Sequence, residues 1–228
     1  MGDKIVSNPF AAFKWEALFK DWSVFGLGFL NTIMLSILAL VLALILGVIF
    51  GVFGALHYKI PKRINRIYVA IIQNTPLVIQ IFFLYNMLPH LGITLSVFVV
   101  GVLGIGIYHG AYIAEVVRAG IQAVAKGQTE AAVSQGFTYI QAMRYIILPQ
   151  ATKLIFPPLT NQVVSLIKNT SVMAMVAGGE LMYTADSWAS NNLYYGPAYV
   201  ATALLYLILC LPIARAAVRL ERKMEVSI

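Results

Sequence analysis

Residues 130–149, EAAVSQGFTYIQAMRYIILP, interrupt an otherwise strongly apolar chain with a polar segment. Thr138 followed by Gln141 is typical of a capping box, in which a hydroxyl and an amide satisfy the unpaired N–H groups that begin a helix. Gly136 lies where a left-handed residue would end the preceding helix, and Pro149 is expected to stop the following one. The stretch therefore predicts two short helices separated by a glycine and ended by a proline.

The composition indicates an integral membrane protein. The chain has 228 residues, of which 60% are hydrophobic and 11% charged, whereas soluble domains are about 25% charged. The net charge of +7 does not predict a nucleic-acid partner, because the basic residues lie at the ends of apolar runs, where they set membrane topology. The single cysteine, Cys210, excludes an intrachain disulfide.

Long runs without charge predict five membrane spans, since a helix needs about 20 apolar residues to cross the hydrocarbon core. The first lies within 22–58. Two more fit within 67–114, joined by the turn-forming sequence LPHLG at 88–92, and the last two cover about 154–181 and 196–219.

The basic residues predict the orientation of these spans. They gather after the first, third and fifth spans, which in a five-span chain all face one side, and the loop 180–196 has no Lys or Arg. Basic loops face the cytoplasm, so we expect the N-terminus outside and the C-terminus inside. The three groups are Lys59, Lys62, Arg63 and Arg66; Arg118, Lys126, Arg144 and Lys153; and Arg215, Arg219, Arg222 and Lys223.

This topology divides the chain into three parts. Residues 1–21 form an external interfacial segment, 22–220 a transmembrane domain with a cytoplasmic segment at 119–152, and 221–228 a cytoplasmic tail. The N-terminus carries both signs of charge and precedes an overlong apolar run, so it is not a cleavable signal. We expect a surface helix whose apolar face carries Trp15, Leu18, Phe19 and Trp22, opposite Lys14 and Lys20; a plain extension of the first span is the alternative.

The polar stretch resembles the EAA motif of permease subunits of binding-protein-dependent ABC importers. Glu130-Ala131-Ala132, three residues, Gly136, nine residues, Ile146, one residue and Leu148-Pro149 match every position of that motif. The sequences NTPL (74–77), AYIAEVVRAGI (111–121), GQTEAA (127–132) and KNTSV (168–172) are similar to the polar amino-acid branch of the same family. The resemblance extends from the first predicted span to the fifth.

The resemblance implies an all-α transmembrane bundle of the type I ABC importer permease fold, in the inner membrane of a bacterium. It implies three partners: cytoplasmic ABC ATPase subunits, a second permease copy or paralogue, and an external amino-acid binding protein. The substrate would be glutamine, glutamate or a related amino acid. The residues that would couple the permease to the ATPase are Gly127, Gln128, Glu130, Ala131, Ala132, Gly136, Leu148 and Pro149.

The chain lacks the G-x-x-x-x-G-K-[ST] motif that cradles nucleotide phosphates. We therefore expect it not to be an enzyme, and to leave ATP and Mg²⁺ to the partner ATPase; we expect no cofactor and no metal in the chain itself. In relatives, ATP binding draws the coupling helices together and opens the cavity outward. An amphipathic interface helix with no protein partner is the alternative to a coupling helix in the polar stretch 130–149. It would explain equally well why Ile140, Met143 and Ile147 fall on one face, and the motif match is what argues against it.

Lys168 is the candidate substrate contact, because it is the one basic residue inside a predicted span and an intramembrane charge usually marks a pathway or a partner. Asn169, Thr170 and Ser171 follow it with further polar groups. Glu115, a further candidate, is expected to pair with Arg118 one turn away. The alternative for Lys168 is a side chain that snorkels to an interface or binds carbonyl groups.

Tyr108, His109 and Tyr112 form a second candidate group in the third span. A lone histidine is more often a hydrogen-bonded packing residue than a ligand, and that alternative stays open for His109. Gln73 stands where the family usually has arginine, which leaves a charged contact of the relatives in doubt.

Glycines such as Gly47 and Gly51 suit either a dimer interface or packing within one bundle.

Two other classes of function compete with the importer. An ATP-independent amino-acid channel or carrier remains the alternative, while no acid–histidine pair or G-x-S-x-G sequence supports an intramembrane serine protease.

Overall fold

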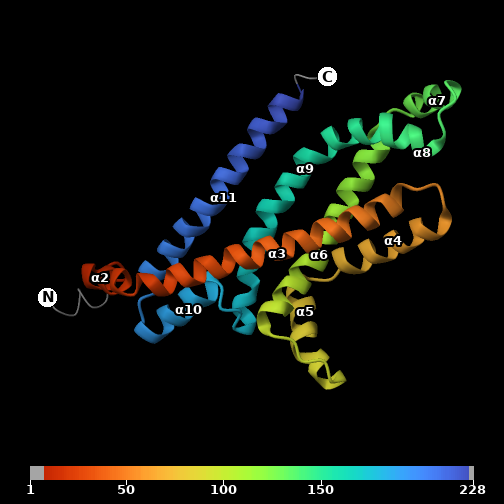
Figure 1. The fold of residues 1–228 in the computed structure, drawn as a ribbon. Coiled ribbons are helices and arrows are strands. Elements are labelled where there is room, and N and C mark those ends of the chain that lie inside the picture. The colour runs from red at the N-terminus through yellow and green to blue at the C-terminus, as the bar shows by residue number, and fades with distance from the viewer. Residues whose placement is uncertain (1–7, 226–228) are drawn as a thin grey trace. The chain divides into compact units, whose positions relative to one another are not determined.

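The computed structural model describes residues 8–225, and within them every regular element is a helix (Figure 1). Four of these elements are short π or 3₁₀ segments, at 83–87, 88–91, 143–147 and 170–176. The α-helices are α2 Ala12–Lys20, α3 Trp22–Ala55, α4 Lys59–Gln73, α5 Leu77–Phe82, α6 Val97–Ala123, α7 Lys126–Ser134, α8 Tyr139–Ala142, α9 Leu148–Asn169, α10 Leu181–Asn192 and α11 Tyr195–Glu225.

Within residues 8–225, three helices, α3, α6 and α11, are long and apolar enough to cross a membrane by length and composition. A fourth crossing results if α4 and the helical segment 77–91, which are separated by a break at 74–76, count as one span. The predicted span at 154–181 coincides with α9 and the 3₁₀ segment 170–176, and α9 carries Pro157 and Pro158 inside it. Five spans and their orientation stay predictions.

Two breaks in the second predicted span follow from prolines. A short gap at 74–76 follows α4, because Thr75 precedes Pro76 and the residue before a proline disfavours helical geometry. The turn predicted at 88–92 is confirmed: Pro89 lies at the start of the 3₁₀ helix Leu88–Leu91, and Gly92 follows in the left-handed region at φ 79°.

The chain consists of two compact units, which are described separately. Unit 1 contains residues 8–39, 77–105 and 166–212 of the described chain, and unit 2 contains 40–76, 106–165 and 213–225. The helices α3, α6, α9 and α11 contribute residues to both.

The core of unit 1 packs the N-terminal helix against α10 and the start of α11. Leu18, Phe25 and Leu181 are fully buried, and Trp188 joins them with its ring 5.6 Å from that of Phe25. The indole N–H of Trp188 donates to Asp21 at 2.8 Å, so the polar edge of this ring is satisfied.

The predicted faces of the N-terminal helix are partly wrong. Lys14 is buried rather than opposite the apolar face, and its ammonium lies 5.6 Å from the ring centre of Tyr194. Phe19 and Trp22 are exposed instead, at 65% and 42% of their surface. The lysine stem covers apolar surface and its charge is stabilised by the aromatic face, which the helical period alone does not reveal.

In unit 2, small residues let α3 and α6 approach closely. A Cβ atom added at Gly47 would lie 2.3 Å from Ile113 Cγ2, and one at Gly51 would lie 2.6 Å from Val117 Cβ. These glycines therefore serve packing within the chain, the second of the two uses weighed for them.

Candidate functional site

The coupling segment, defined here as residues 126–147, has the local structure predicted for it. Helix α7 ends before Gly136, which has φ 85°. The backbone N–H of Thr138 donates to Gln141 Oε1 at 2.8 Å, and the backbone N–H of Gln141 donates to Thr138 Oγ1 at 3.3 Å. Both the left-handed glycine and the capping box are thus confirmed.

The predicted stop at Pro149 is wrong. Helix α8 runs through the π-helical turn Met143–Ile147 directly into α9, whose second residue is Pro149. A proline is tolerated inside this continuous path because the π turn before it shifts the backbone hydrogen-bond pattern. The segment is therefore helix, glycine turn and then a continuous helical path.

The π turn also changes which residues share a face. Ile140 is 76% exposed, whereas Ile147 is buried, so the apolar face predicted from Ile140, Met143 and Ile147 is wrong. One wide turn shifts the phase of all later residues relative to an ideal helix. The sequence reading did not detect this shift.

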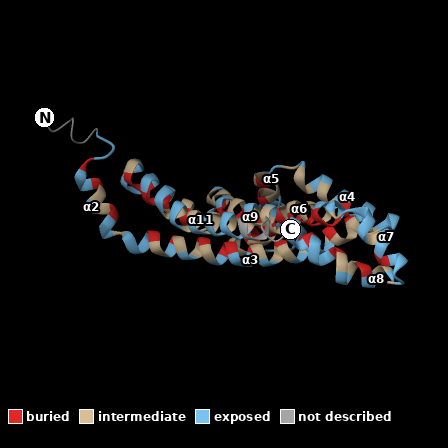
Figure 2. Ribbon diagram, turned by 90° about the horizontal axis from the view of Figure 1, so that it is seen from above, coloured by how far each residue is buried: buried red, intermediate tan, exposed pale blue. Residues whose placement is uncertain are grey.

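The motif residues lie mostly on the surface. In Figure 2, α7 and α8 are largely in the colour of exposed residues. Ala132 is buried and anchors α7, and two exposed apolar side chains that the motif does not include, Val133 and Ile140, add to this surface. The exposed motif positions are Gly127, Gln128, Glu130, Ala131, Gly136, Leu148 and Pro149.

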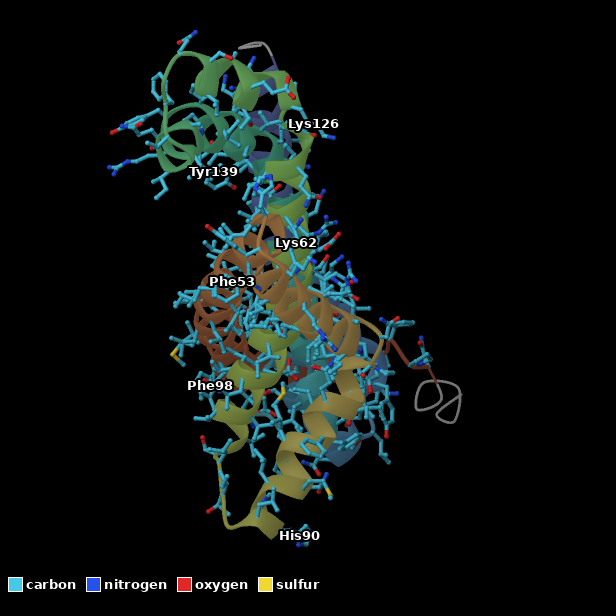
Figure 3. The ribbon with its side chains drawn as sticks, turned by 90° about the vertical axis from the view of Figure 1, so that its right-hand side faces the viewer. Phe53, Lys62, His90, Phe98, Lys126 and Tyr139 are labelled. Carbon is cyan, nitrogen blue, oxygen red and sulfur yellow. The ribbon has the colours of Figure 1, made fainter. Side chains whose placement is uncertain are left out.

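A cavity of about 520 Å³ lies beneath the coupling segment. Lys62 of α4 and Lys126 and Tyr139 of the segment line it, and Figure 3 labels all three. The Tyr139 hydroxyl is buried with no hydrogen-bond partner among the described residues, and burial raises the pKa of this phenol. The ring of His57 contacts that of Tyr139 edge to face, with centres 5.3 Å apart.

The predicted substrate residues in unit 2 come together on α6. The hydroxyls of Tyr108 and Tyr112 lie 3.2 Å apart. His109 is buried, and its Nδ1 is 3.2 Å from Gln162 Oε1 on α9, as the packing alternative requires. Glu115 forms the predicted ion pair with Arg118.

Tyr112 and Glu115 line a cavity of about 530 Å³, here called the α6–α9 cavity. Two glutamines outside the candidate set complete its polar lining, Gln73 and Gln162. The Gln73 side-chain amide donates to the carbonyl oxygen of Ala111 at 3.2 Å. The departure from arginine at position 73 was the one signal that could have drawn attention to this site.

The other predicted substrate residues belong to unit 1. Lys168 is exposed, and with Ser171, Tyr199 and Tyr206 it lines a hollow of about 310 Å³. Thr170 does not line this hollow: it is fully buried, and its hydroxyl donates to the carbonyl oxygen of Ile167 at 2.7 Å. Asn169 is the last residue of α9, and the 3₁₀ segment Thr170–Val176 follows it directly.

A buried carboxylate that the sequence analysis did not single out lies in the same unit. Glu180 is fully buried and caps α10, where its oxygens accept hydrogen bonds from the backbone N–H groups of Met182 and Tyr183, both at 2.7 Å. The Tyr206 hydroxyl donates to it at 2.9 Å. These three donors satisfy carboxylate oxygens that would be costly to bury without hydrogen bonds.

Comparison with known proteins gives consistent relatives. Residues 43–226 match the family described as "Binding-protein-dependent transport system inner membrane component". The chain is 43% identical over 210 residues to the "Probable glutamine ABC transporter permease protein GlnM" of Bacillus subtilis, covering 92% of this chain and 97% of that protein. The L-cystine transport system permease protein TcyB of the same organism is 31% identical, with 94% and 92% covered.

Solved structures agree with these relatives. A chain of an amino acid ABC transporter crystallised with histidines has a TM-score of 0.86 and 32% identity, with 92% of this chain and 98% of that chain covered. A chain of the MetNI methionine ABC transporter, at 19% identity and a TM-score of 0.72, shares the fold over 86% of this chain and 94% of that one. With a family match over most of its length, the chain belongs to the inner membrane components of binding-protein-dependent transport systems, the permease subunits of ABC importers.

Proposed function

We propose that this permease carries glutamine or a closely related polar amino acid across the inner membrane of a bacterium, driven by ATP that a separate subunit hydrolyses. The chain itself would be no enzyme. Its partners would be cytoplasmic ATPase subunits, a second copy of the permease or a paralogue, and an external binding protein that delivers the substrate.

The observation that carries the coupling role is the exposed helix α7 with its left-handed exit at Gly136. Ala131 leaves the surface of α7 flat, Glu130 offers a carboxylate, and Val133 and Ile140 are 54% and 76% exposed. Exposed apolar side chains rimmed by polar ones are typical of a protein interface. An ATPase subunit would cover them.

The substrate class rests on the relatives. The B. subtilis protein at 43% identity is named for glutamine, as is a second B. subtilis relative at 32%, whereas the relative at 31% is named for L-cystine. The polar lining of the α6–α9 cavity suits such a substrate, since glutamine side chains and a tyrosine hydroxyl both donate and accept hydrogen bonds. Gln73, Gln162, Tyr112 and Glu115 are the proposed contacts there, with Lys168 and Ser171 as proposed contacts in unit 1.

Reconstitution tests this function. The permease, purified with its ATPase and placed in proteoliposomes with the cognate binding protein, should accumulate labelled glutamine only when ATP and Mg²⁺ are supplied to the ATPase side. Unlabelled glutamine should compete, while lysine and arginine should not. Glutamine flux that continues without ATP would favour the alternative of a channel or carrier, and uptake of a different amino acid would correct the substrate.

A further inference from the structure

A polar groove runs along one face of α4 in unit 2. It encloses about 470 Å³ and lies between this helix and the C-terminal half of α6. Its α4 residues recur every three or four positions, which places them on one side of the helix along its whole length. The lining residues are Gly54, Lys62, Asn65, Arg66, Val69, Ala70, Gln73, Asn74, Glu115, Arg118 and Gln122.

The groove carries an excess of positive charge. Three of its lining residues are cations, Lys62, Arg66 and Arg118, and one is an anion, Glu115. Arg118 is occupied by Glu115, whereas Lys62 and Arg66 are exposed and make no ion pair with any side chain that the structure describes. The ammonium group of Lys62 and the guanidinium group of Arg66 are therefore available to an anion that enters the groove.

The floor of the groove has a polar group that is not fully satisfied. Asn65 is only 4% exposed, and its Oδ1 atom has no hydrogen-bond partner within the described chain. A Cβ atom at Gly54 would lie 2.5 Å from Asn65 Nδ2 and 2.8 Å from Arg118 Cδ, so the glycine leaves room for both side chains. Buried polar atoms without partners are uncommon, and a small rotation of this amide would turn it toward a ligand.

The groove adjoins the α6–α9 cavity. Gln73 and Glu115 line both, so a small polar molecule that leaves the cavity past these two residues enters the groove. Continuing along α4, it meets Arg66 and then Lys62, near the end of the helix that the distribution of basic residues assigns to the cytoplasm. This continuity favours a transported molecule over a lipid headgroup as the ligand.

We propose that the α4–α6 groove is the site from which the amino acid is released to the cytoplasm, with its carboxylate held by Lys62 and Arg66. The inference rests on the proposed function and adds a substrate class to it. Neutral and acidic amino acids fit the groove, whereas a cationic side chain meets two unpaired positive charges. Selection against lysine and arginine thus takes place in the permease as well as in the binding protein.

Direct binding to the nucleotide-free permease–ATPase complex, without the binding protein, tests the site. Calorimetric titration with L-glutamate, L-glutamine and L-arginine should give the tightest binding for glutamate and the weakest for arginine. The double variant Lys62→Gln/Arg66→Gln should weaken glutamate and glutamine binding about tenfold or more, because it removes two charge-assisted hydrogen bonds. The double variant should also reduce the difference in binding affinity between glutamine and arginine.

The matched control is Lys59→Gln/Arg63→Gln, which removes the same charges from the same helix at exposed positions outside the groove. It should bind all three amino acids as the unmodified complex does. Equal affinities in Lys62→Gln/Arg66→Gln and the unmodified complex, or no binding to either, would overturn the release site. Loss of amino-acid binding in nanodiscs that contain phosphatidylglycerol, but not in phosphatidylcholine alone, would assign the groove to lipid headgroups instead.

The proposed function is judged separately, by ATP-dependent glutamine uptake of the unmodified complex. Uptake together with unchanged binding in the groove variant would refute the release site and leave the transporter intact. A complex that binds glutamate in the groove but accumulates no glutamine would refute the substrate and leave the site.

Discussion

Lys168 and Glu180 are charged residues of the same unit with opposite surroundings. Lys168 is exposed beside Tyr199 and Tyr206, whereas Glu180 is fully buried under three hydrogen-bond donors. The pairing of Glu115 with Arg118 could be predicted because the two lie one helical turn apart. The role of Glu180 could not, since one of its donors, Tyr206, is 26 residues away and only the fold brings it near.

Replacing Lys168 by methionine separates a substrate contact from a snorkelling side chain. If the ammonium binds the substrate carboxylate, Lys168→Met should lower uptake about ten- to a hundredfold, the effect of one charge-assisted hydrogen bond. Lys168→Arg, which keeps the charge, should retain more activity. Uptake kinetics in proteoliposomes measure this, and normal uptake with higher thermal stability would make Lys168 structural.

Removal of the Glu180 carboxylate should destabilise the permease. Glu180→Ala takes away the cap of α10 and leaves the Tyr206 hydroxyl and two backbone N–H groups without their acceptor, so we expect the melting temperature in detergent to fall by about 4 to 8 °C. Asp186→Ala is the control, because Asp186 is exposed and bonds to Tyr199 at the surface. Equal effects of the two substitutions would contradict the structural role of Glu180.

The coupling segment is the element whose sequence was most informative. Its glycine turn and capping box are local features, in which the residues that make the contacts lie within four positions of one another, and both were predicted correctly. The π turn at 143–147 was missed because capping residues and glycines mark where helices begin and end, not where the hydrogen-bond pattern within a helix changes. For the same reason the exposure of Ile140 and the burial of Ile147 could not be predicted from the helical period.

A valine at position 136 should abolish both transport and the substrate-stimulated ATP hydrolysis that accompanies it. Gly136 has φ 85°, a conformation that costs a β-branched residue about 1 to 2 kcal/mol or more. Gly136→Val should therefore displace α8 relative to α7 and abolish substrate-stimulated ATP hydrolysis, measured on the reconstituted complex, while membrane insertion remains normal. Gln135→Val introduces the same side chain one residue earlier, at φ −87°, and should be much milder. Normal transport by Gly136→Val would refute the coupling role.

For the whole molecule, composition and motif spacing were sufficient to predict a helical membrane protein of the permease family, and the family match agrees with that prediction. The number of crossings was harder to predict. Helix α9 contains two prolines and a run of polar residues, so length and composition do not identify it as a span. A helix packed against others in a bundle needs fewer apolar residues than one that faces lipid on all sides.

Cysteine labelling tests the predicted topology. Ser134 and Ser190 are both exposed, and the five-span topology places them on opposite sides of the membrane. In a Cys210→Ala background, a membrane-impermeant maleimide should label Ser190→Cys in intact cells and Ser134→Cys only in inverted vesicles. Labelling of both from the same side would exclude five spans.

The direct passage from α8 through the π turn into α9 has a mechanical consequence. No coil separates these helices, so the connection has little slack. A displacement of α8 is therefore passed on to the start of α9 as torque, because the hydrogen-bonded backbone resists twisting more than an open loop would. If α8 rotated about the glycine turn at Gly136, the start of α9 would therefore move with it.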